Sequence, residues 1–297
     1  MTKASIIYNP KAGNKKLSSA MDQIVARMLD AYDSVSLYET KKPGDGADYV
    51  RRLENKTDVV VTAGGDGTVN EIAGTLCALD NRPSLAVIPG GTCNDFSRAI
   101  GMAQHPLRAV EQIVRGKKKS IEVGCFENRY FLNFWGIGLI TEVSSEIDPR
   151  KKASLGRLAY YISALQNLSN PKSFHLRLES EDRHFEGEAV MVIVGNGPFT
   201  GGVRAFFPRL DVGDGKLDVL IVKRTSLRFI WSWLHSKVYE TFPVQEDNLI
   251  HFRTKKLRIS ADPEQLVDCD GERGQYTPAE VFVLPEHLDV LIGDLPN

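Results

Sequence analysis

A glycine-rich turn around one carboxylate is the stretch of this sequence best suited to chemistry. It reads Gly64-Gly-Asp-Gly-Thr-Val-Asn-Glu71, after the apolar run Val59–Val61 and before apolar residues at helical spacing from Ile72 to Cys77. The pattern predicts a buried strand, a tight turn and a helix. Backbone N–H groups in such a turn can bind a phosphate, and glycine lets the anion come close. Asp66 adds a hard oxygen ligand suited to magnesium.

The same turn has a simpler interpretation as an ordinary connection between a strand and a helix. It lacks the Gly-Lys-Ser/Thr ending of a P-loop, and it lacks the G-x-G-x-x-G spacing of a dinucleotide site. Its function must therefore be judged together with the loops around it.

Alternation of strands and helices predicts that several loops meet at one edge of a parallel sheet. Short apolar runs predict strands at residues 5–8, 35–38, 59–61 and 85–88. Amphipathic patterns predict helices at residues 21–29, 47–53 and 107–114. Ligands of such sheets bind beyond the carboxyl ends of the strands. We expect one crevice lined by Asn9–Gly13, Thr40, Gly65–Glu71 and a second glycine-rich turn, Pro89–Arg98.

Two charged residues at this edge have alternative interpretations. Lys11 could meet a phosphate or be a solvated loop charge. Asp95, a second carboxylate at the edge, could serve the site or simply interact favourably with the N-terminus of a helix.

Composition limits the classes of function. The chain has 297 residues, 42% of them hydrophobic and 25% charged, with a net charge of −1. That length suits two domains, and that charge gives no bulk electrostatic reason to expect nucleic acid as a partner. We find neither a signal peptide nor a run of about 18 apolar residues. The four scattered cysteines favour reduced thiols in a cytoplasmic protein.

The pattern changes between residues 122 and 128, where short strands replace the alternation. Strands are expected around residues 126–134, 174–179, 188–195, 217–222, 257–259 and 281–284, with helices at 155–168 and 227–238. This predicts a β-rich second domain, a sandwich or a barrel. Membrane contact could involve the basic cluster Arg115–Lys119 or the aromatic residues Phe229–Trp233, although a helix cap and a core helix explain them as well.

Two acidic stretches of the second domain could carry chemistry. Asp211 and Asp214 lie three residues apart in a glycine-rich turn that also offers a free carbonyl, a set able to hold a hard cation. Asp268-Cys-Asp-Gly-Glu272 holds three carboxylates, and mutual repulsion can raise one pKa into the range of a general base. Each stretch is also compatible with a plain acidic turn.

Taken in order, the motifs resemble the bacterial diacylglycerol kinase family, soluble lipid kinases that share a catalytic domain with sphingosine kinases. The resemblance runs from about residue 4 to residue 292. It rests on Asn9–Gly13, Gly64–Glu71, Gly90–Arg98, Asp214-Gly-Lys-Leu217 and Asp270-Gly-Glu272.

The resemblance implies a two-domain fold. An N-terminal α/β parallel-sheet domain (1–124) binds nucleotide, and a C-terminal β-rich sandwich domain (125–283) carries the general base and a structural metal. The tail (284–297) packs back on the first domain, and the nucleotide site lies in the cleft between the domains. Family members often dimerise through the β-rich domain, so a homodimer is one expected assembly.

The implied activity is transfer of the γ-phosphoryl group of ATP to a lipid hydroxyl, with magnesium. Diacylglycerol is the first acceptor to test, and the implied location is the cytoplasm, peripheral to the inner face of the membrane. ATP is expected on Asn9, Pro10, Lys11, Ala12, Gly13, Thr40, Gly65, Asp66, Gly67, Thr68, Val69, Asn70, Glu71, Thr92 and Asp95, of which Asp66 and Asp95 order catalytic magnesium. Asp270 is expected to be the general base, supported by Glu272. The structural magnesium is expected on Asp211, Asp214 and the Lys216 carbonyl.

The sequence departs from the family at Glu122, where Asp is common in the acid network around the magnesium. Asp268 receives no role from the resemblance. Two other functions fit the first motif: a kinase of soluble substrates resembling NAD kinase, and a sensor that binds nucleotide or lipid without turnover. A Thr-Gly-Ser-Thr-Ala-Tyr-like segment, expected of NAD kinases, is absent. The sequence does not identify the acceptor lipid.

Overall fold

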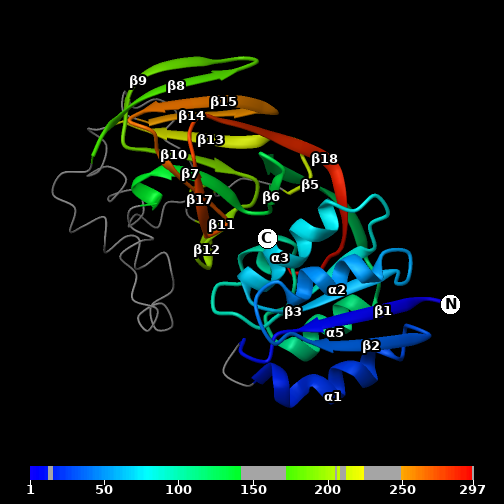
Figure 1. Cartoon of the computed structure of the whole chain (residues 1–297). Helices are drawn as coiled ribbons and strands as arrows, with labels where there is room; N and C mark the ends of the chain where they lie inside the picture. Colours follow the sequence, from blue (N-terminus) through cyan, green and yellow to red (C-terminus); the bar gives the residue numbers. More distant parts are fainter. Residues whose placement is uncertain (13–15, 142–171, 205, 208–211, 224–248, 296–297) are drawn as a thin grey trace. The chain divides into compact units, whose positions relative to one another are not determined.

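The computed structural model describes residues 1–12, 16–141, 172–204, 206–207, 212–223 and 249–295 (Figure 1). Its contacts divide the chain into two compact units. Unit 1 comprises Met1–Val123 with Pro285–Asn297, and unit 2 comprises Gly124–Leu284. The helices predicted at 155–168 and 227–238, and the aromatic residues at 229–233, lie outside the described residues.

Unit 1 contains a parallel sheet in the order β2-β1-β3-β4. The strands are β1 (Lys3–Tyr8), β2 (Ser34–Glu39), β3 (Val59–Gly64) and β4 (Ser84–Pro89). The helices are α1 (Lys16–Met28), α2 (Asp45–Leu53), α3 (Asp66–Cys77), α4 (Asp95–Ala99) and α5 (Pro106–Val114). The four predicted strands and three predicted amphipathic helices of this half are confirmed within a few residues.

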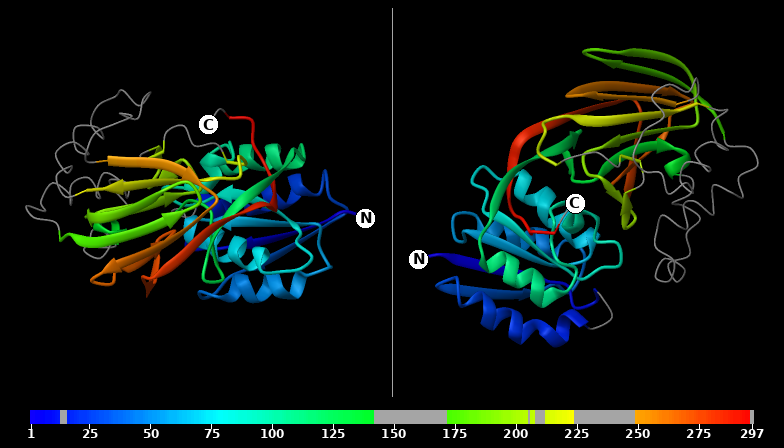
Figure 2. Two further views of the ribbon diagram at one scale, coloured as in Figure 1. Left: turned by 90° about the horizontal axis from the view of Figure 1, so that it is seen from above. Right: turned by 180° about the vertical axis from the view of Figure 1, so that it is seen from behind.

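Helices cover both faces of this sheet, α2 and α3 on one side and α1 and α5 on the other (Figures 1 and 2). Every residue of β3 and β4 is accordingly buried, as continuous apolar runs in a doubly covered parallel sheet should be. Strand β2 lies at the edge of the sheet, and Leu37 there is 48% exposed. This arrangement places the loops after β1, β2, β3 and β4 at one end of the sheet.

The last strand of the chain, β18 (Ala279–Leu291), has residues in both units, as does β5 (Lys118–Phe126). The end of β18 runs parallel to β4, with Val290 opposite Leu85. Beyond it, the N–H of Gly293 donates to the Ile100 carbonyl at 2.9 Å, and the N–H of Leu295 to the Gly101 carbonyl at 3.1 Å. The C-terminal segment is therefore part of unit 1.

Acids of this segment neutralise much of the basic cluster Arg115–Lys119. Arg115 pairs with Asp294 at 2.8 Å, and Lys118 pairs with Asp289 at 2.7 Å. The lowered pKa of the Asp289 carboxyl has its largest cause in a hydrogen bond from Lys118. These pairs give the cluster a role in holding the C-terminal segment.

Unit 2 is built from two antiparallel sheets. One has the order β14-β13-β10-β7-β16-β17, and the other contains β18, β15, β8 and β9. The strands of these sheets are β7 Phe134–Gly138, β8 Phe174–Ser180, β9 His184–Ala189, β10 Met191–Gly195, β13 Leu217–Val222, β14 Leu249–Thr254, β15 Lys256–Asp262, β16 Leu266–Cys269 and β17 Glu272–Tyr276. In addition, β6 (Arg129–Phe131) pairs with β5, and β11 (Phe199–Thr200) and β12 (Val203–Arg204) form a separate two-stranded sheet. Buried side chains from both sheets, among them Trp135, Phe174 and Val219, form one core.

Two predicted stretches of unit 2 have different bounds from those expected. Residues 126–134 contain the end of β5, all of β6 and the first residue of β7. The apolar run 188–195 divides at Val190, where the chain leaves β9 in one sheet and enters β10 in the other. Val190 is fully buried, and its N–H donates to the Val222 carbonyl at 2.9 Å. Hydrophobicity does not change at the crossing because both sheets bury their residues in the same core. Among the described residues, no helix is long and apolar enough to cross a membrane.

The close contact of the C-terminal segment predicts an unequal response to two glycine substitutions. A Cβ at Gly293 would lie 1.9 Å from the carbonyl oxygen of Gly101, whereas a Cβ at Gly74 in α3 would meet nothing within 4 Å. We expect Gly293→Ala to lower the free energy of unfolding by about 1–3 kcal/mol. Gly74→Ala should raise it by up to about 1 kcal/mol, since alanine favours a helix interior. Thermal unfolding checks both, and an unchanged midpoint for Gly293→Ala would contradict the contact.

Candidate active site

The N-terminus of α3 has the features of an anion site. Gly65 is its N-cap residue, and it makes no side-chain capping hydrogen bond of its own. A Cβ built on Gly67, in the first turn, meets no atom within 4 Å. A helix start without a side-chain cap and with space beside it can accept a phosphate at its N–H groups.

The second glycine-rich loop lies directly against the first. The N–H of Gly90 donates to the Gly64 carbonyl at 2.7 Å. A Cβ on Gly91 would lie 2.8 Å from the Cα of Gly65, so the two backbones approach too closely for larger residues. Glycine at these positions is therefore required by loop-to-loop packing as well as suited to a phosphate.

Side chains of α3 bind two of the neighbouring loops. The carboxylate of Asp66 accepts from the N–H of Asp95 at 2.7 Å and from that of Asn94 at 3.0 Å. Thr68 Oγ1 accepts from the Asn9 side-chain amide at 3.1 Å. The predicted meeting of these loops at one edge is present in unit 1.

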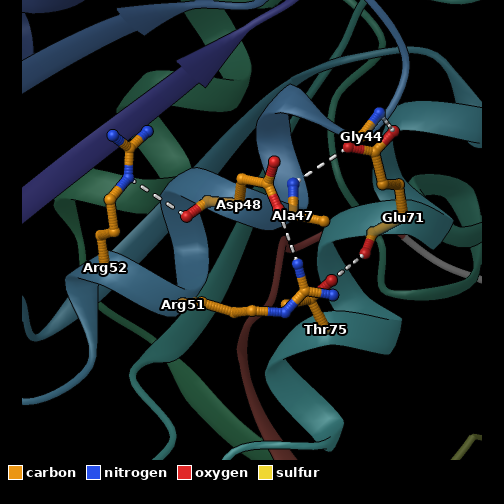
Figure 3. Close-up of polar contacts among 7 residues, drawn as sticks. All are labelled: Gly44, Ala47, Asp48, Arg51, Arg52, Glu71 and Thr75. Carbon is orange, nitrogen blue, oxygen red and sulfur yellow. Dashed lines mark hydrogen bonds and ion pairs between the residues drawn. The ribbon is translucent and has the colours of Figure 1, made fainter.

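Glu71, expected in the nucleotide set, binds a third loop through its carboxylate. It accepts from the N–H of Gly44 at 3.2 Å and from that of Ala47 at 3.0 Å, both at the start of α2 (Figure 3). Thr40 precedes this helix, and its N–H donates to the Tyr8 carbonyl at 2.9 Å. The Glu71 carboxylate is thus engaged by protein N–H groups.

The remaining residues expected to bind nucleotide differ in accessibility. Lys11 and Thr92 are exposed, and the N–H of Lys11 donates to Asn9 Oδ1 at 3.0 Å. The side chain of Val69 is only 3% exposed, so its contribution to any ligand site would come from the backbone. Asp95 is 7% exposed and begins α4. Gly13 lies outside the described residues.

In unit 2, Asp270 and Gly271 form the two-residue turn between β16 and β17. Cys269 and Glu272 are paired across it. Asp270 has φ of 52° and Gly271 has φ of 89°. Positive φ at both central residues is typical of a type I′ hairpin turn, which Asp-Gly favours. The turn and the carboxylate are therefore specified by the same two residues.

The carboxylate of Asp270 is held by the backbone entering β7. It accepts from the N–H groups of Leu132 at 2.7 Å, Asn133 at 3.1 Å and Phe134 at 2.8 Å. Burial raises the pKa of Asp270 to about 7, with a further increase from the charge of Asp268, although the three N–H donors act in the opposite direction. A carboxyl with this pKa can take up and release a proton near neutral pH.

The neighbouring acids have separate positions. Asp268, to which the sequence assigned no role, is fully buried and accepts from the Gly271 N–H at 2.7 Å, which closes the turn. Glu272 pairs with Arg129 at 2.8 Å, and its side chain is 60% exposed. The charge of Asp268, rather than a contact from Glu272, is the acidic influence on the Asp270 pKa that the structure describes.

Asp214, one of the residues expected to hold a structural magnesium, has both carboxylate oxygens engaged by other groups. Asp214 pairs with Arg253 through one oxygen and accepts from the Lys216 N–H at 3.1 Å through the other. Within the described parts of the chain, no three His, Cys, Asp or Glu side chains are grouped so as to hold a metal ion. Asp211, the third expected ligand, lies outside these parts. The magnesium assignment to Asp211, Asp214 and Lys216 stays a prediction.

Sequence reasoning overlooked the groups that hold Asp270. Leu132, Asn133 and Phe134 contribute backbone N–H groups, which leave no signature in residue type. The buried Asp268 had a usable signal, because an Asp two residues before Asp-Gly can accept from the turn's own N–H.

Both halves of the chain match known families. The diacylglycerol kinase catalytic domain matches residues 3–126. The YegS C-terminal NAD kinase beta sandwich-like domain matches residues 137–292. A crystal structure of a diacylglycerol kinase from Bacillus anthracis str. Sterne aligns with a TM-score of 0.87 and 35% identity, covering 98% of this chain and 97% of that one.

Curated relatives agree. The diacylglycerol kinase of Bacillus subtilis is 30% identical over 295 residues, covering 98% of this chain and 97% of the relative. The diacylglycerol kinase of Staphylococcus aureus strain MRSA252 is 32% identical and covers 99% and 94%. The fold and these matches define a lipid kinase enzyme. The chain belongs to the diacylglycerol kinase family, which confirms the resemblance seen in the sequence motifs.

The raised pKa of Asp270 predicts a pH-dependent stability. Its ordinary value of 3.8 applies in the unfolded chain and about 7 in the folded one, so the folded state binds the proton more tightly. The contribution of this proton is fully present below pH 3.8 and is lost as the pH rises to about 7. The free energy of unfolding should therefore fall across this range more steeply in wild type than in Asp270→Asn. Denaturant unfolding at a series of pH values measures both slopes, and parallel slopes would contradict the assignment.

Proposed function

We propose that this enzyme transfers the γ-phosphoryl group of ATP to the hydroxyl of diacylglycerol, giving phosphatidic acid and ADP. Asp270 carries the proposal, because its raised pKa and fixed carboxylate suit a general base. As the hydroxyl oxygen bonds to the γ-phosphorus, its proton passes to the Asp270 carboxylate. The bond from phosphorus to the β–γ bridging oxygen breaks, and its electron pair leaves with ADP.

The loops of unit 1 would hold ATP. The N-terminus of α3 offers N–H groups beside the open space at Gly67. Asn9–Ala12, Thr40 and Thr92 belong to loops at the same end of the sheet. Phosphoryl transfer demands mostly positioning and charge neutralisation from a protein, and these loops supply fixed donors for both.

Asp66 suits magnesium in this role. Its carboxylate accepts two N–H groups, at 2.7 and 3.0 Å, which orient it and leave other lone pairs for a cation. Magnesium usually binds one or two carboxylates together with substrate phosphates, so a single oriented Asp fits it better than a closed cage would. When bound, the ion would neutralise phosphate charge. Asp95 and Glu122 are buried, at 7% and 2% exposure, and would belong to the acid network around the ion.

Diacylglycerol is proposed as the acceptor because relatives that match almost the whole chain are diacylglycerol kinases. We also propose that the enzyme works at the inner face of the cytoplasmic membrane, where such a lipid is found, and that it can form a homodimer. The NAD kinase-like description of the second domain makes NAD the soluble acceptor to compare.

The first test is transfer of labelled phosphate from ATP in mixed micelles that contain a panel of lipids, beside soluble NAD. We expect product with diacylglycerol, and we expect Asp270→Asn to lower the rate by a factor of about 10²–10⁴, the usual loss when a general base is removed. Asp48→Asn, an exposed change on α2, serves as the control. Transfer to NAD alone would contradict the lipid acceptor, and ATP binding without any product would favour a sensor.

The pH dependence of the rate provides a separate test of the base. Since the carboxylate form accepts the proton, kcat/KM should rise with pH and level off above about 7, the pKa of Asp270. The variant Asp270→Asn should lose this rise along with most of the activity. Wild-type kcat/KM that stays flat from about pH 5.5 to 8.5 would argue against Asp270 as the base.

A further inference from the structure

Helix α2 begins without a cap from its own sequence. Its N-cap residue, Gly44, is in the left-handed region with φ of 89°, and no side chain of the capping position makes a hydrogen bond. The N–H groups at this end are instead bound by Glu71, which lies 27 residues further along the chain on α3. One carboxylate oxygen accepts from Gly44 and the other from Ala47 (Figure 3).

The residues around the Glu71 carboxylate leave space for it and fix its backbone. A Cβ on Gly46 would lie 3.0 Å from Glu71 Oε1, so glycine leaves the room that the carboxylate occupies. A hydrogen bond of 2.8 Å from Thr75 Oγ1 to the Glu71 carbonyl secures the backbone of α3 at that point. A negative charge at a helix N-terminus is favourable, and charge-assisted hydrogen bonds are stronger than neutral ones.

The contact fixes the loop that carries Thr40. At one end of this loop, the N–H of Thr40 donates to the Tyr8 carbonyl of β1 at 2.9 Å. At the other end, Asp45 accepts from the N–H groups of Lys41 and Lys42 at 2.8 and 3.0 Å, which joins the loop to the first turn of α2. The position of that turn relative to α3 is set by Glu71.

We propose that Glu71 is a positioning residue, which holds the Thr40 loop and α2 against the phosphate-binding end of α3 and does not itself contact the nucleotide. The proposal rests on the proposed function, in that unit 1 binds ATP. It differs from the expectation for the motif, which placed Glu71 among the residues that hold ATP.

Two measurements on Glu71→Ala test this together. In ligand-free protein, amide hydrogen exchange at Gly44 and Ala47 should accelerate by about tenfold or more, because a charge-assisted acceptor is lost. In ATP titrations without lipid, the Kd should rise by about tenfold, since the loop is displaced. The kcat, measured separately with the lipid acceptor, should change less, since the base is untouched.

Two further variants complete the comparison. Glu71→Gln should fall between wild type and Glu71→Ala in both readouts, because the amide oxygen can accept one N–H while its NH₂ faces the other donor. It also replaces Glu71→Ala if that variant does not fold. Asp48→Ala, which removes an exposed 2.8 Å ion pair with Arg51 on the same helix, should leave both readouts unchanged.

Each outcome decides the proposal. Weaker ATP binding with unchanged exchange would mean that Glu71 contacts the nucleotide directly, and faster exchange with unchanged ATP binding would mean a purely structural cap. Either result overturns the positioning role. If wild type does not bind ATP, the proposed function fails, and exchange alone then shows whether Glu71 holds α2.

Discussion

The first two turns of α3 form the centre to which the loops of unit 1 are attached. Asp66 binds the loop before α4, Thr68 binds the loop after β1, and Glu71 binds the start of α2. All three are polar side chains that bond to groups in loops, and their spacing of two and three residues directs them to different neighbours around one helix. Gly67, between the first two of them, leaves open space beside the backbone. One short motif thus combines an open helix N-terminus with side chains that hold the surrounding loops.

In unit 2, a hairpin turn positions the carboxylate of Asp270. The Asp-Gly turn requires positive φ at Asp270, and this conformation directs its carboxylate to three consecutive N–H groups before β7. A second buried acid, Asp268, closes the turn and opposes ionisation of its neighbour. The same turn therefore determines both the hairpin and the pKa of the Asp270 carboxyl. The turn residues take part both in the pairing of β16 with β17 and in the environment that sets the pKa of Asp270.

Much of the fold could be predicted from the sequence, because buried faces of helices and strands produce periodic patterns of apolar residues. The continuous runs of β3 and β4 and the alternation of β8 identified their elements. The crossing at Val190 produced no such pattern, because both sheets bury apolar residues in the same core and the residue types do not change there. For the site, motif order indicated which residues matter. It could not indicate that Glu71 faces a helix end, because that role depends on backbone N–H groups distant in the sequence. The role of Asp268 depends on the N–H of Gly271, only three residues away, and was open to prediction from the turn sequence.

Strand β18 also determines the order in which the two units can finish folding during synthesis. Its end lies beside β4, and the segment after it bonds to Ile100 and Gly101, so residues near the C-terminus finish a unit whose other strands come from the first 126 residues. During synthesis on the ribosome, the edge of β4 that pairs with β18 stays unpaired until β18 has emerged. Unit 1 is therefore begun before unit 2 and completed after it. Premature termination within residues 124–284 leaves both units incomplete.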